Sequence, residues 1–230
     1  MDNRYAYIAL MLLWIAPIKA QDIFILPFKG SGGGPSGEFG VDDTTQSSAT
    51  TWSHTCATDN GMLTVCLGVA YRTVTSIAYN GDALTELVDR DKGGFRSAIW
   101  YLLLPDDGTH DIVVTLSSST SDFRALATSW NEVDQSTPFS YSGEAEGTST
   151  TATRDQTSAE GEIVIDACAT YDGGGFTVGS GQSGYYWSSR TGELAFGSSQ
   201  ESGASSVTMS WSKWNSEDWS ICTASVKPNP

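Results

Sequence analysis

The hydrophobic positions in most of the chain recur at every second residue, in short runs separated by turn-forming residues. The segment MLTVCLGVAY places Leu63, Val65, Leu67 and Val69 on one side of an extended strand. Similar runs follow about every 8–12 residues, which is the spacing expected of an antiparallel sandwich. Helical periods are missing between these runs, which excludes a plan of alternating strands and helices.

Two turn signals divide this series. Asn80-Gly81 in VTSIAYNGDALTELV predicts a tight hairpin, and PDDG at 105–108 predicts a turn between FRSAIWYLLL and THDIVVTL. FRALATSW, GEIVIDACATY, GELAFGSS, SSVTMSW and DWSICTASV continue the series. We therefore predict an all-β fold, an antiparallel two-sheet β-sandwich of jelly-roll or lectin-like type, from about Ser47 to Val226 in a domain of residues 47–230.

Two segments precede this domain: an apolar N-terminal segment, residues 1–28, and a flexible Gly/Ser-rich tether, residues 29–46. The run from Ile8 to Ile18 is shorter than the roughly 20 residues of a membrane span. It suits a signal peptide that is cleaved after Ala20. Apolar character resumes in IFILPF, so the alternative is a retained peg that anchors in a partner. The anchoring side chains are then Leu10, Leu12, Leu13, Trp14, Ile23, Phe24 and Phe28.

The net charge of the chain excludes some classes of binding partner. The chain carries 27 acidic and 12 basic residues, a net charge of −15. Such a surface repels phosphate backbones and anionic lipid, so we expect no nucleic-acid partner and no binding to anionic membranes.

The four cysteines leave two alternatives open. A hairpin at Asn60-Gly61 would place Cys56 opposite Cys66, and Cys168 and Cys222 would meet if their strands are neighbours. The alternative is four buried free thiols. No C-x-x-C pair occurs, which argues against zinc.

Residues suited to catalysis form no recognisable pattern. His54 and His110 each stand beside a strand end, and a G-x-S-x-G nucleophile elbow is missing. Acidic stretches such as VDRDKGG leave calcium as an alternative, although Asp and Gly are ordinary turn residues and no complete calcium loop is present. We therefore predict no enzyme activity, no catalytic residues, no metal site and no cofactor.

Aromatic residues in polar surroundings supply the candidate ligand site. Trp214 in MSWSKWNSEDWS and Tyr186 and Trp187 in SGYYWSSRTG are predicted to present rings to a ligand. Exposed rings suit stacking on sugars or docking on a partner.

Several stretches also resemble a known kind of module. YNGDALT, the run from IWYLLLPDDGTH to IVVTL, VDQSTP and GEIVIDACAT are similar to a jelly-roll or lectin-like β-sandwich module found in phage virion proteins and in secreted or surface proteins of bacteria. The resemblance spans about Thr50 to Pro228, and it implies a sandwich without catalytic residues.

These observations lead to two expectations. The first is a non-enzymatic structural or binding module of a phage virion, of decoration, tail or fibre type, which displays an acidic sandwich at the virion surface. Its partners would be other virion proteins or further copies of itself. The alternative is a secreted, extracellular bacterial module for carbohydrate binding or cell-surface adhesion, which would bind surface glycans.

Overall fold

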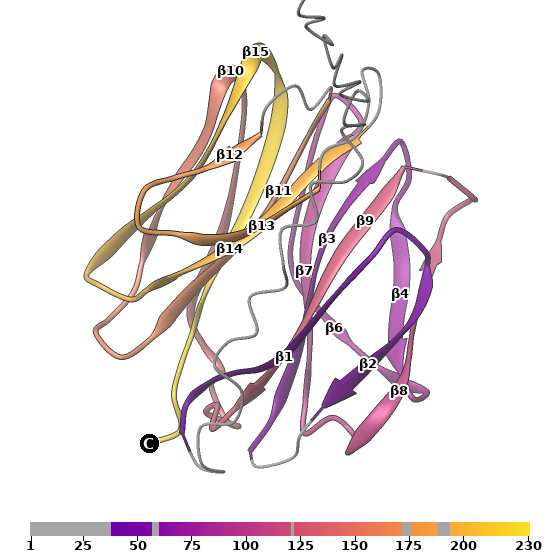
Figure 1. Ribbon diagram of the computed structural model, residues 1–230, viewed down its shortest axis with the longest axis vertical. Helices are drawn as coiled ribbons and strands as arrows, with labels where there is room; N and C mark the ends of the chain where they lie inside the picture. The colour runs from indigo at the N-terminus through magenta and orange to yellow at the C-terminus, as the bar shows by residue number, and fades with distance from the viewer. Residues whose placement is uncertain (1–37, 57–59, 121, 172–175, 188–193) are drawn as a thin grey trace, which may run out of the picture.

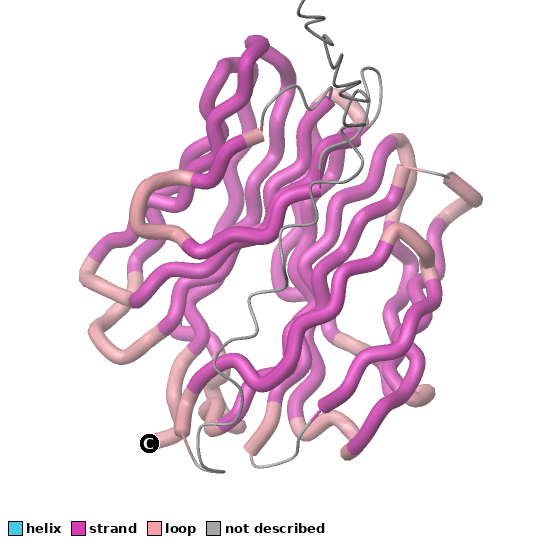
Figure 2. Tube along the Cα trace, viewed as in Figure 1, coloured by secondary structure: helices cyan, strands magenta, loops and turns pink. Residues whose placement is uncertain are grey.

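The computed structural model describes residues 38–56, 60–120, 122–171, 176–187 and 194–230. This part of the chain is built from antiparallel strands joined by loops, which confirms the predicted all-β sandwich class (Figures 1 and 2). Within it, no helix has the length and apolar character that crossing a bilayer requires.

The strands form three sheets, where the sequence pattern predicted two. The central sheet has five strands, in the order β1 (Gly40–Ser47), β9 (Phe123–Asn131), β3 (Met62–Ala70), β7 (Phe95–Leu103) and β6 (Thr85–Lys92). The small sheet has the order β2 (Thr51–Cys56), β8 (Gly108–Leu116), β4 (Val74–Tyr79) and β5 (Asp82–Ala83). The large sheet has the order β10 (Phe139–Thr157), β15 (Ser206–Val226), β11 (Ile163–Tyr171), β14 (Leu194–Ser202) and β13 (Ser183–Trp187), and β12 (Thr177–Val178) pairs with β15.

The central sheet lies between the other two, as Figure 1 shows. Strand β3 is therefore buried at every position from Met62 to Ala70. Its odd-numbered residues, such as Leu63 and Leu67, pack against the small sheet, and Met62 and Cys66 pack against the large sheet. The hydrophobic alternation in the sequence correctly predicted the face of β3 that packs against the small sheet. The other face carries small or uncharged side chains, and this is the mark of a strand that is buried on both sides.

A third apolar cluster lies on the far side of the large sheet. Strands β10 and β15 are long and irregular in the middle. Strand β15 joins the two predicted runs SSVTMSW and DWSICTASV, whereas β10 covers a stretch in which the sequence pattern predicted no strand. Val164 and Cys168 of β11 share this cluster with Met209 and Trp211 from the first half of β15. The large sheet thus curls and covers much of its own outer face.

Both predicted turns are present, but only the first joins two paired strands of one sheet. Asn80 (φ 49°) and Gly81 (φ 93°) form the expected tight hairpin, with Tyr79 opposite Asp82. The turn at 104–107 instead carries the chain from β7 in the central sheet to β8 in the small sheet.

The predicted C-terminal boundary of the tether, residue 46, is wrong, because the residues from Gly40 onwards belong to β1. Strand β1 pairs with β9 from Gly40 to Ser47. Its Asp- and Thr-rich sequence shows little hydrophobic alternation because nearly all of its residues are only partly buried.

The cysteines are four buried free thiols, which is the second of the two alternatives, and neither candidate disulfide is formed. Cys56 lies between the small and central sheets, whereas Cys66 faces the large sheet. Strands β11 and β15 are neighbours, as that pairing required, but Cys168 is opposite Ile221, and Cys222 is opposite Ala167. This offset of one residue puts the two thiols on opposite faces of the sheet.

Candidate functional site

A cavity of about 250 Å³ lies between the central and large sheets, on the side where β1 and β13 are the outermost strands. We call it the interlayer cleft. Its apolar lining residues are Val41, Cys66, Leu126, Trp130, Ile163 and Ile165. Its polar lining residues are Thr44, Thr64, Thr128, Ser183, Ser198, Ser199 and Gln200. None of these described lining residues is charged, in a protein whose net charge is −15.

The cleft lies at this side because the two sheets are joined at the other. There, Glu146 of β10 lies 2.9 Å from Arg90 and 3.6 Å from Lys92, both of β6. The rings of Tyr101 and Phe139 also meet edge to face, with their centroids 5.1 Å apart. Strands β6 and β10 thus hold the sheets together, and β1 and β13 leave a space between them.

Several hydroxyl groups of the cleft are already used within the protein. The indole Nε1 of Trp130 donates to Thr64 Oγ1 at 2.9 Å, and Thr64 Oγ1 donates to the carbonyl oxygen of Thr128 at 3.4 Å. Ser198 Oγ donates to the carbonyl oxygen of Asp166 at 2.6 Å. The cleft is therefore an uncharged space in which the hydroxyl groups of Thr64 and Ser198 already have partners within the protein, and the rest of its wall offers apolar surface and further polar groups to an occupant.

Cys66 is the one thiol among the described lining residues, and it is not activated. Burial raises its pKa to about 12, against a weaker opposing effect of the hydrogen bond with Ser198. The thiol is protonated at neutral pH, so it supplies no thiolate nucleophile.

A buried carboxyl group stands directly behind the cleft. Asp166 is fully buried, and its Oδ2 accepts a hydrogen bond from Trp211 Nε1 at 2.8 Å while its Oδ1 accepts one from the Ser199 amide at 2.6 Å. Burial raises the pKa of Asp166 to about 7, although these hydrogen bonds lower it. The Trp211 ring also stacks on Phe176, with 4.8 Å between centroids. Asp166 therefore fastens the first half of β15 to β11 and β14.

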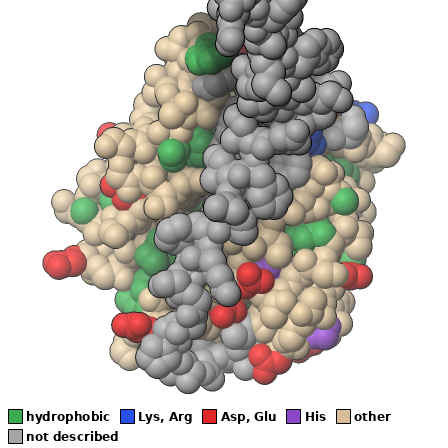
Figure 3. All heavy atoms as spheres, viewed as in Figure 1, with side chains coloured by type: hydrophobic (Ala, Val, Ile, Leu, Met, Phe, Trp, Pro, Cys, Tyr) green, Lys and Arg blue, Asp and Glu red, His purple; other side chains and the backbone are tan. Residues whose placement is uncertain are grey.

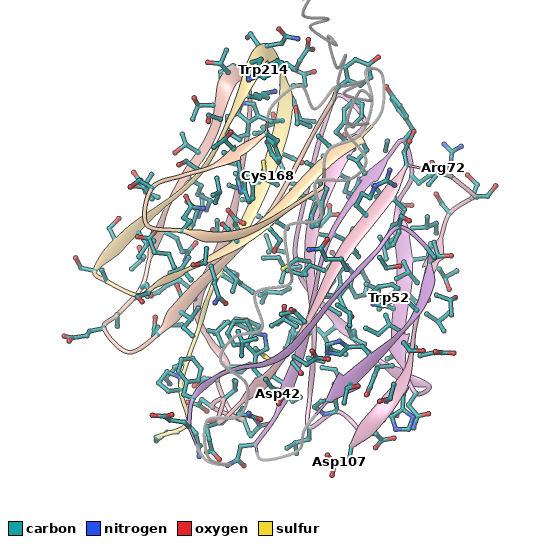
Figure 4. All side chains as sticks on the ribbon, in the orientation of Figure 1. Asp42, Trp52, Arg72, Asp107, Cys168 and Trp214 are labelled. Atoms are coloured by element: carbon teal, nitrogen blue, oxygen red, sulfur yellow. The ribbon has the colours of Figure 1, made fainter. Side chains whose placement is uncertain are left out.

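Trp214 is the exposed indole that the sequence predicted, with 78% of its surface accessible. The pairing of β10 with β15 jumps from Ser149↔Glu217 to Thr151↔Ser212, so residues 213–216 have no partners in that ladder. The Lys213 ammonium is buried and donates to Thr170 Oγ1 at 2.8 Å and to the Glu217 carbonyl oxygen at 2.7 Å. Lys213 thereby anchors this irregular stretch from inside, and Trp214 projects outward (Figure 4). Burial lowers the pKa of Lys213 to about 8.

The other predicted ligand and anchor residues lie partly or wholly outside the described residues. Tyr186 and Trp187 belong to β13, where they pair with Gly197 and Phe196, but their side chains are not described. The predicted anchor, from Leu10 to Phe28, precedes the first described residue, Glu38.

Both histidine rings contact neighbouring groups of the protein. His54 is buried, and its Nδ1 lies 2.9 Å from Thr45 Oγ1. Burial lowers its pKa to about 4, against the opposing effect of Asp43 and Asp42. His110 Nε2 lies 2.9 Å from the Asp107 carbonyl oxygen, and its ring meets that of Tyr79 edge to face.

The acidic loop VDRDKGG lies largely in β6, and its carboxylates have a protein partner. Arg96 pairs with Asp89 and lies 3.9 Å from Asp91 Oδ2. Across the described ranges, no group of three or more His, Cys, Asp or Glu side chains is placed to hold a metal ion.

The interlayer cleft was not predicted from the sequence. One signal was present: Thr64, Thr128, Ser198 and Ser199 stand within otherwise apolar strands. Small hydroxyl side chains on a buried face leave space and need hydrogen-bond partners. Which strands face each other across that space depends on the assignment of strands to sheets, and the alternation of residues does not contain that information.

Comparison of the chain with known protein families, with characterised proteins and with solved structures found no match.

Proposed function

We propose that the protein is a non-enzymatic structural module of a phage virion, of decoration, tail or fibre type. In this proposal the N-terminal segment attaches the chain to a neighbouring protein, and the acidic sandwich projects from the virion surface. The partners are other virion proteins or further copies of the chain.

The observation that carries the proposal is the polarity of the domain along its longest axis. Asp42, near the start of β1, and the C-terminus lie toward one end, and Trp214 lies at the other (Figures 1 and 4). A chain that enters at one end and presents an exposed ring at the other suits a module that is held at its base. Acidic side chains are spread over the half near the base on the face seen in Figure 3, and they favour a solvated surface.

Sedimentation velocity of the full chain tests the attachment. We expect a defined oligomer, or co-sedimentation with proteins of its own virion, that is lost when Leu12 and Trp14 are both replaced by Asp. The matched control, Tyr141→Asp, changes an apolar side chain that is 55% exposed on β10 and should leave association unchanged. If the chain sediments as a monomer both alone and with proteins of its own virion, and replacing Leu12 and Trp14 does not change its sedimentation, the proposal is contradicted.

A second candidate function is glycan binding by a secreted bacterial module, and the exposed Trp214 indole favours it. Titration calorimetry against a glycan panel tests it. Binding that disappears in Trp214→Ala but survives in Tyr141→Ala would support it, because stacking on a sugar needs an exposed ring. Heat signals that are zero across the panel would eliminate this candidate and leave the structural module in place.

A further inference from the structure

We propose that the interlayer cleft is the docking site for an apolar segment of the same chain, Ile23–Phe28 (IFILPF). The first apolar run, Ile8–Ile18, would remain available to a partner. This inference does not depend on the virion role, and it holds whether or not the chain is cleaved after Ala20, because both products retain the segment.

The chemistry of the cleft matches that of the segment. The described lining residues are uncharged and include Leu126, Trp130 and Ile165. The six residues of IFILPF are all uncharged and apolar, and they stand between Asp22 and Lys29. The cleft, of about 250 Å³, has an uncharged wall with six apolar residues, and apolar side chains of the segment would bury surface against that part of the wall.

The backbone beside the cleft offers hydrogen bonds as well. Among the described residues, β1 pairs only with β9, and β13 pairs only with β14. Each strand therefore presents one free edge of amide and carbonyl groups. An extended segment that lies along such an edge adds a strand to the sheet, and its alternate side chains enter the neighbouring space.

The tether is long enough to reach the cleft. Residues 29–37 (KGSGGGPSG) separate the segment from Glu38, and Val41, three residues further on, already lines the cleft. A flexible tether of this length spans about 16 Å on average and about 30 Å at full extension. Such a short connection gives the segment an effective concentration of about a millimolar at its own cleft, which favours docking within one chain over exchange between chains.

Cysteine cross-linking in the full chain tests the proposal. Ser183 is an exposed cleft residue on β13, and Ser183→Cys is combined in turn with one introduced cysteine at each position from Ile23 to Phe28, in a chain in which Cys66→Ala removes the native thiol of the cleft. Copper-phenanthroline oxidation should cross-link at least one of these pairs within a monomer at a rate at least tenfold above two controls. One control pairs Ser183→Cys with Leu10→Cys. The other replaces Ser183→Cys by Ser142→Cys, at an exposed serine on β10 at the opposite side.

Each outcome decides the question. Rapid intramolecular cross-links confined to positions 23–28 support docking in the chain's own cleft. Covalent dimers formed by the same pairs would overturn the same-chain assignment and show exchange between copies. Cross-linking no faster than in the controls would overturn docking altogether. Loss of the oligomer in the sedimentation test would not alter any of these results, so the two proposals fail separately.

Discussion

The two faces of the central sheet are closed in different ways. Toward the small sheet, fully buried residues such as Leu67, Ile77 and Ile112 form a continuous apolar core. Toward the large sheet, the sheets meet along β6 and β10 but leave the interlayer cleft along β1 and β13. Both faces contain a buried apolar cluster, and the difference is that the face toward the large sheet also retains a space. A space bordered by two strand edges that are unpaired among the described residues is costly to leave empty, because it adds no packing and invites pairing with other chains.

The largest effect should come from the closed face. Leu67→Ala empties a position with 0% exposure and should lower the free energy of unfolding by about 3–4 kcal/mol. Leu126→Ala, at the cleft, should cost about 2 kcal/mol, because this side chain already borders a cavity and has fewer contacts to lose. Urea unfolding measures both. Equal losses would mean that the cleft is as well packed as the core.

Filling the cleft should have the opposite sign. Thr128→Ile adds apolar volume at a lining residue and should raise the free energy of unfolding by about 1 kcal/mol. If Ile23–Phe28 occupies the cleft, the larger side chain competes with it, and the gain should appear only when Phe24 and Phe28 are also replaced by Asp. Measuring the substitution in both backgrounds therefore separates an empty cleft from an occupied one.

The two sides of the central sheet should also respond oppositely to pH. His54 lies beside β1 in the small sheet, and burial lowers its pKa from 6.5 to about 4. Unfolding exposes a histidine that binds a proton more readily, so this contribution to stability is present above about pH 6.5 and is lost as the pH falls toward 4. Asp166 lies in the large sheet, and burial raises its pKa from 3.8 to about 7. The folded state there holds the proton more tightly, so this contribution is present below about pH 4 and is lost as the pH rises toward 7.

Single substitutions expose each of these opposing contributions. Asp166→Asn should leave a protein whose midpoint of urea unfolding falls on acidification from pH 7 to 4.5. His54→Gln should leave one whose midpoint rises over the same interval, and the unsubstituted chain should vary less than either. The same slope in all three proteins would contradict the assigned pKa shifts.

The smallest effect is expected at the ion pairs of the β6/β10 side. Arg90 and Glu146 are both partly exposed, so Glu146→Gln should cost little stability, and the cost should vanish in high salt. A loss that persists at 1 M salt would show that packing, rather than charge, holds this side together.

The sequence predicted the class of the fold well, because strands and tight turns are local features. The alternation in β3 and the Asn80-Gly81 hairpin depend on neighbouring residues, and both are present. The sequence did not predict which strands belong to which sheet. Strands β2 and β3 are consecutive, yet Cys56 and Cys66 lie in different cores, because the chain crosses from one sheet to another between them.

The register between strands that are far apart in the sequence could not be predicted from local sequence patterns either. Strands β11 and β15 are neighbours, but the pairing of Cys168 with Ile221 depends on contacts along the whole of both strands. For the candidate site, the exposure of Trp214 could be predicted from its polar surroundings. The interlayer cleft could not, because its walls come from β1, β3, β9, β11, β13 and β14, which are scattered along the chain.

Amide hydrogen exchange of the full chain, compared with a variant carrying Phe24→Asp and Phe28→Asp, tests the contrast between the two sides most directly. If the segment docks in the cleft, the substitutions should speed exchange in β1 and β13 at least tenfold and leave β6 and β10 unchanged. Exchange rates that are the same in both proteins, or that rise equally on both sides, would contradict the account.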